Sequence, residues 1–116
     1  MICFFVKIIY KGGETMRKCK ITVMRKAEYK DLSEIYENPI EHTCDMKLGQ
    51  VFITEGEKPK DMCDSAWESI APFATALCKG EENFFDGWMK NPKSAMISCN
   101  DGFRPVSFYI EVIEND

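Results

Sequence analysis

Residues 94–114, SAMISCNDGFRPVSFYIEVIE, hold two apolar stretches on either side of a short loop that contains glycine. In the second stretch apolar residues recur at every other position, which is typical of a strand with one face on a core. These residues are Val106, Phe108, Ile110 and Val112. The Asn-Asp-Gly sequence at 100–102 favours a tight turn. The segment therefore predicts a β-hairpin, with strands at 94–99 and 104–114.

Working outward from this hairpin, apolar alternation predicts two more strands, at 19–24 and 49–54. Cys19 shares the core-facing side of the first of them with two β-branched residues. Between these strands, apolar residues at helical spacing over 28–36 predict one or two turns of helix, which a following proline ends.

The principal helix is expected over 61–79, with Asp61 as its N-cap and Gly80 just beyond its end. An apolar stripe at helical spacing indicates the face that turns to the sheet. Its members are Cys63, Trp67, Ile70, Ala74 and Leu77. Pro72 interrupts the pattern because it lacks the amide hydrogen, so we expect a kink there or two shorter helices.

The resulting element order is β-(short α)-β-α-β-β. It predicts an α+β domain, in which a mainly antiparallel four-stranded sheet carries the principal helix on one face.

Length and composition are those of one domain with its own core. The chain has 116 residues, of which 45% are apolar and 29% charged. Its formal charge of −4 argues against a dedicated nucleic-acid binder. No run approaches the roughly 20 apolar residues of a membrane span. We therefore expect a single domain over 16–116 that binds neither nucleic acid nor membrane.

Residues 1–15, MICFFVKIIYKGGET, are interpreted as a translated leader or other non-native extension. The sequence around Gly12-Gly13 can be encoded by a purine-rich tract typical of a bacterial ribosome-binding site, a few nucleotides before the codon of Met16. The alternative is an edge strand over 4–10. Without the leader, which carries two lysines and one glutamate, the formal charge becomes −5.

The six cysteines are the compositional feature that needs explanation. Cys3 falls in the expected leader, which leaves an odd number and no export signal, so we expect a reducing cytoplasm rather than a disulfide framework. Cys19 and Cys78 sit in apolar patterns and are predicted to be core residues.

The other three cysteines, Cys44, Cys63 and Cys99, stand at element ends or in polar segments, where binding residues gather. The first turn of a helix favours a thiolate at Cys63, whereas the flanking Asp61 and Asp64 oppose it. Each of the three also has a purely structural reading, which the sequence leaves open.

His42 precedes Cys44 in H-x-C spacing, and together with Cys63 and Cys99 it completes a Cys3-His set that would suit zinc or an iron centre. The same three thiols also suit redox chemistry. Cys44 would form a disulfide with Cys63 or with Cys99, or a sulfenate on one of the three would react with a neighbouring thiol.

Four short motifs resemble an uncharacterised family of small prokaryotic proteins. The most specific is Cys-x-Asp-Gly-x-Arg-Pro-Val-x-Phe, which starts at Cys99; the weaker ones begin at Gly49, Cys63 and Trp88. The resemblance covers 16–114 and implies no reaction, substrate or cofactor. Relatives often carry a second cysteine where this chain has Ser98, so a vicinal dithiol is not expected here.

Two functions from different classes follow. The first is a thiol-dependent module that binds a small ligand or metal, or cycles its redox state, through Cys63 and Cys99. Other residues would orient or wall this site. They are Cys44, Asp101, Arg104, Trp67 and Trp88. The second is a non-catalytic module that docks a partner protein through the aromatic loop 84–89. A third reading, an enzyme with Cys63 or Cys99 as nucleophile, is left open.

Overall fold

The computed structural model describes residues 16–40 and 44–114. The expected leader, residues 1–15, lies outside the described residues. The elements in chain order are β1 (Lys18–Lys26), α1 (Lys30–Tyr36), β2 (Val51–Thr54), α2 (Asp64–Lys79), the 3-10 turn η1 (Phe84–Asp86), β3 (Ser94–Ser98) and β4 (Val106–Glu114).

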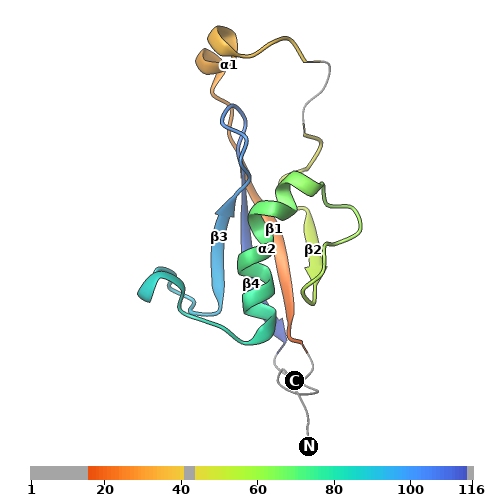
Figure 1. The fold of residues 1–116 in the computed structure, drawn as a ribbon, viewed down its shortest axis with the longest axis vertical. Coiled ribbons are helices and arrows are strands. Elements are labelled where there is room, and N and C mark those ends of the chain that lie inside the picture. The colour runs from red at the N-terminus through yellow and green to blue at the C-terminus, as the bar shows by residue number, and fades with distance from the viewer. Residues whose placement is uncertain (1–15, 41–43, 115–116) are drawn as a thin grey trace, which may run out of the picture.

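The four strands form one antiparallel sheet in the order β2-β1-β4-β3, and α2 packs along one face of it (Figure 1). The two long strands are central, with Ile21 opposite Ile110. The short strands β2 and β3 form the edges. This arrangement confirms the predicted α+β fold, its element order and the C-terminal hairpin.

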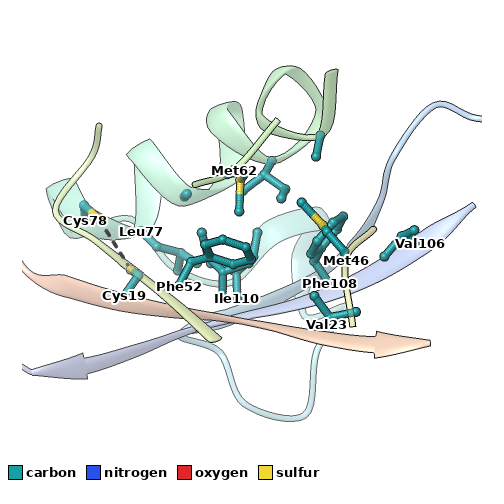
Figure 2. Packing of buried hydrophobic residues seen from close by; sticks show 14 residues of the cluster. Cys19, Val23, Met46, Phe52, Met62, Leu77, Cys78, Val106, Phe108 and Ile110 are labelled. Carbon is teal, nitrogen blue, oxygen red and sulfur yellow. Dashed lines mark hydrogen bonds between the residues drawn. The ribbon is translucent and has the colours of Figure 1, made fainter. Parts of the chain in front are cut away.

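The core lies between α2 and the sheet (Figure 2). The helix contributes Ala66, Ile70, Ala74, Leu77 and Cys78, all at most 2% exposed. Opposite them stand alternate residues of the central strands, as the pattern of period two predicts. Burial of each large aliphatic side chain stabilises the fold by about 1.5–3 kcal/mol.

The predicted apolar stripe was wrong at its N-terminal end. Cys63 is exposed and Trp67 only half-buried, whereas Ala66 and the preceding Met62 are buried. Ala66 lies in register with Ile70 and Ala74 at steps of four residues, so it takes the core-facing position. Trp67 follows one residue later, about 100° further around the helix.

The ends of α2 follow from local chemistry. The N-cap is Cys63 rather than Asp61. Met62 is buried in a turn just before the helix, and the extended backbone of Cys63 leads into the first helical residue, Asp64. Gly80 ends the helix in the left-handed conformation, with a φ of 109°, as predicted. The helix passes through Pro72 as a single element, so of the two alternatives that of two shorter helices was wrong. Pro72 has no amide hydrogen to donate to the carbonyl of Glu68, four residues earlier. Because Pro72 is exposed, water can reach that carbonyl.

Candidate functional site

Three cysteines from three separate segments line one cavity of about 220 Å³. They are Cys44, Cys63 and Cys99, with Asp101 and Arg104 beside them. A wider hollow of about 610 Å³ shares Cys44, Cys63 and both charged residues. The N-terminal end of α2 and the C-terminal end of β3 lie toward the same end of the molecule, which brings these segments together (Figure 1).

Cys63 reaches the cavity as the N-cap of α2. Its backbone is extended, with φ −70° and ψ 153°, and its carbonyl accepts the first helical hydrogen bond from the amide of Trp67 at 3.1 Å. The side chain is exposed, and Sγ lies 3.7 Å from the hydroxyl of Ser65. The thiol therefore stands in front of the helix rather than against the sheet.

Cys99 directly follows β3 and is half-buried. Its amide donates to the carbonyl of Val106 at 3.0 Å, and the Val106 amide donates back to Cys99 Sγ at 3.3 Å. The second bond takes the place of a backbone pairing at the point where the hairpin widens into its loop. It holds the sulfur at the start of β4, facing the cavity.

Cys44 is positioned by a lysine from the central sheet. Lys26 Nζ donates to the carbonyl of Met46 at 2.6 Å and to that of Cys44 at 3.3 Å. Met46 is buried, whereas Cys44 remains exposed. The thioether thus anchors the segment in the core and leaves the neighbouring thiol at the rim.

Asp101 and Arg104 play more structural parts than the sequence suggested. One carboxylate oxygen of Asp101 accepts the amides of Phe103 and Arg104 at 2.8 and 3.0 Å, which shapes the loop. The Arg104 guanidinium forms a two-point ion pair with Glu37, at 2.8 and 3.0 Å. The hydrogen bond from Glu37 raises the pKa of Arg104, and the nearby Glu28 adds to this shift. The positive charge of Arg104 is therefore already balanced by the carboxylates of Glu37 and Glu28.

Negative charge dominates the wider hollow, which Cys44 and Cys63 line and Cys99 does not. Four carboxylates line the wider hollow against the single guanidinium of Arg104, a formal charge of −3. The carboxylates belong to Glu37, Asp45, Asp61 and Asp101. Since unlike charges attract and like charges repel, this rim favours neutral or cationic ligands over anions.

Within residues 16–40 and 44–114, no three His, Cys, Asp or Glu side chains are arranged to hold a metal ion. The three cysteines share a cavity without forming a ligand set for zinc or iron by themselves. His42, the fourth predicted ligand, lies outside the described residues.

Neither tryptophan walls this cavity, contrary to the prediction. Trp67 packs partly against the core. Trp88 belongs to the aromatic loop that precedes β3, whereas Cys99 follows that strand, and five strand residues span about 17 Å. Trp88 instead contacts Phe85 edge-on, with ring centroids 5.3 Å apart.

Sequence reasoning missed Lys26 and Glu37, because their partners lie 18 and 67 residues away along the chain. Met46 carried no distinguishing signal, since Leu48 lies two residues further in the same polar loop and is exposed.

No family model, curated protein or solved structure matches this chain. The resemblance of the C-terminal motif to a family of small prokaryotic proteins therefore stays a prediction. Among the helices of the described residues, none is long and apolar enough to cross a membrane.

Proposed function

We propose that this protein is a thiol-dependent ligand-binding module. Cys63 and Cys99 meet the ligand, and Cys44 provides a third thiol at the rim. The observation that supports the proposal is the single cavity of about 220 Å³ that all three cysteines line. Segments this far apart in the chain do not bring three thiols to one cavity through local sequence pattern.

The ligand class follows from sulfur chemistry and from charge. A thiolate attacks an electrophile such as a disulfide: a new sulfur–sulfur bond forms, the old one breaks, and the leaving thiolate takes a proton. The four carboxylates of the rim repel anionic molecules. We therefore assign the site to a small neutral or cationic thiol-reactive molecule.

Two small disulfides of opposite charge test this assignment. Cystamine carries amines and dithiodiglycolate carries carboxylates. Each is added to the native and to the unfolded chain, and the modification of every cysteine is followed by peptide mass mapping. One unit charge at about 4 Å is worth about 1 kcal/mol in water, so native Cys63 should favour cystamine about fivefold more than unfolded Cys63 does.

Two matched variants test whether the carboxylates of the rim, rather than the overall surface charge, cause the preference for cystamine. Asp61→Asn removes a rim carboxylate and should reduce the preference for cystamine. Asp31→Asn, on the exposed helix α1, should leave it unchanged. Cys19 and Cys78 serve as buried internal controls. Equal reactivity of Cys63, Cys99 and the buried pair, or the absence of any charge preference, would contradict the proposal.

A second candidate, a protein-interaction module, is supported by the aromatic loop. Phe85 is 72% exposed and Trp88 45% exposed. Asn83, Phe85 and Asp86 all have left-handed backbones, with φ of 59°, 51° and 60°. Such conformations cost non-glycine residues about 1 kcal/mol or more each, and that kind of strain clusters at functional sites.

Photo-crosslinking tests this second candidate. A photo-reactive phenylalanine analogue at position 85 should capture one dominant protein in cells. The same analogue at Tyr36, which is 74% exposed on α1, is the matched control. Equal and diffuse labelling from both positions would rule out a docking role for the loop.

A further inference from the structure

Two cysteines that the proposed site does not use meet in the core. Cys19, near the start of β1, is 0% exposed, and Cys78, in the last turn of α2, is 1% exposed. Their sulfurs lie 3.5 Å apart, and both point at each other across the space between helix and sheet (Figure 2). The two residues are 59 positions apart in the chain, so the fold alone creates this pair.

The backbones on both sides of the pair are held together by other contacts. The Arg17 amide donates to the carbonyl of Cys78 at 2.9 Å. The Arg17 guanidinium donates to the carbonyl of Leu77 at 2.9 and 3.1 Å. The start of β1 is thereby fixed to the end of α2, independently of the thiols. To form a disulfide, the two sulfurs must close from 3.5 Å to the bond length of about 2.05 Å.

The two thiols are not equivalent. The Cys78 thiol donates its hydrogen to Cys19 Sγ. This hydrogen bond, together with the charge of Arg17, lowers the pKa of Cys19 in spite of its burial. The same hydrogen bond, burial and the neighbouring Cys19 raise the pKa of Cys78. Because Cys78 donates the hydrogen bond, Cys19 is assigned as the sulfur that attacks an oxidant and Cys78 as the one that resolves the product.

We propose that Cys19 and Cys78 form an oxidation-sensitive dithiol, which a small hydroperoxide closes to a disulfide between β1 and α2. The oxidant must be small and uncharged because both sulfurs are buried. It reaches them when the end of α2, which stops at Gly80, opens briefly and its contacts with Arg17 break. Charged disulfide reagents of the kind suited to the cavity are excluded from this pair.

The reaction balances with hydrogen peroxide as the oxidant. The Cys19 thiolate attacks one peroxide oxygen, the oxygen–oxygen bond breaks, and the leaving hydroxide takes a proton to become water. Cys19 is then a sulfenic acid. Cys78 sulfur attacks the Cys19 sulfur, the sulfur–oxygen bond breaks, and the hydroxide leaves with the Cys78 proton as a second water. Two thiols lose two electrons, which the peroxide receives.

The expected consequence is a covalent crosslink between β1 and α2 that stabilises the fold. The disulfide closes a loop of 59 residues. Because a crosslink of this span restricts the unfolded chain, the thermal unfolding midpoint should rise by about 10 °C or more. Reduction with dithiothreitol should return it to its starting value.

The test uses the full chain treated with hydrogen peroxide. Remaining thiols are alkylated in denaturant, and the chain is digested without reduction. Mass spectrometry should find the Cys19 and Cys78 peptides joined, with a mass lower by two hydrogen atoms than the sum of the reduced peptides. In Cys78→Ser the joined peptide should vanish, and Cys19 should instead be trapped as a sulfenic acid by dimedone.

A variant with serine at Cys3, Cys44, Cys63 and Cys99 removes every other thiol and should still form the disulfide. If it does not fold, the peptide map of the unaltered chain decides the matter. The proposal is overturned if Cys19 and Cys78 stay reduced while Cys63 oxidises. It is overturned equally if either residue pairs with another cysteine, or if the linked chain gains no thermal stability. None of these outcomes bears on the charge preference of Cys63, which tests the cavity.

Discussion

The two ends of helix α2 carry the same residue type in opposite settings. Cys63, at the N-terminal end, is exposed and lines a cavity with two other thiols. Cys78, fifteen residues later and about 22 Å along the helix, is buried against the thiol of Cys19. The difference teaches that the setting of each cysteine depends on its place along α2 and on what the sheet places opposite it.

The largest effect is expected at the buried end. Leu77→Ala removes a side chain that is 0% exposed, so the free energy of unfolding should fall by about 2–5 kcal/mol through lost burial and the cavity that is left. Urea denaturation measures this as a lower midpoint with an unchanged slope. Leu48→Ala, at a position that is 64% exposed, is the control and should lie within about 0.5 kcal/mol of the unaltered protein.

The cysteines themselves give the next effect. Cys78→Ser places a smaller and more polar group in the core and should cost about 1–2 kcal/mol of unfolding free energy under reducing conditions. Cys63→Ser, at the exposed end, places a favoured N-cap residue before α2 and should therefore leave the unfolding free energy unchanged or raise it. Equal costs at both positions, measured side by side in urea, would erase the contrast between the two ends of the helix.

Glu37→Gln sharpens the description of the exposed end. Arg104 loses its two-point partner and the rim loses one negative charge. The thermal midpoint should fall by a few degrees, and the preference of Cys63 for cystamine should weaken. Glu34→Gln, on the exposed helix α1, is the control. An unaltered preference would mean that Glu37 does not act on the thiols.

The smallest effect concerns the first turn of α2. Lys58 donates to Asp64 at 2.7 Å, and this hydrogen bond lowers the pKa of the Asp64 carboxyl below its ordinary 3.8. The pair therefore stabilises the fold fully above the unfolded pKa, and the contribution is lost as the pH falls through the lower folded pKa. Asp64→Asn should slightly lower the thermal midpoint at neutral pH. Below the folded pKa it should cause no change.

The fold was within reach of pattern reasoning. Alternation over 104–114 and the Asn-Asp-Gly turn predicted the hairpin, and Gly80 marked the end of the helix, because these are local preferences of the backbone. The N-cap and the first member of the buried stripe were misplaced by a few residues. There, the anchoring of Met62 in the core outweighs the local capping preference of Asp61.

The candidate site, like the fold, was predictable from the sequence only in part. Placement at element ends was enough to single out Cys44, Cys63 and Cys99, and all three line one cavity. The assignment of Trp88 to the same site failed, because a strand of five residues separates the aromatic loop from Cys99. Strand length was readable from the sequence, whereas the direction in which each loop leaves the sheet was not.

Local periodicity and turn chemistry specify the elements and their order, since each rests on neighbours a few residues apart. The arrangements on which the two proposals rest join distant residues. Cys19 contacts Cys78, Arg104 pairs with Glu37, and Cys63 and Cys99 line one cavity. Such pairs depend on strand order and on the rotation of α2 over the sheet. Packing of the whole core sets both, because no short segment can bury its apolar face alone.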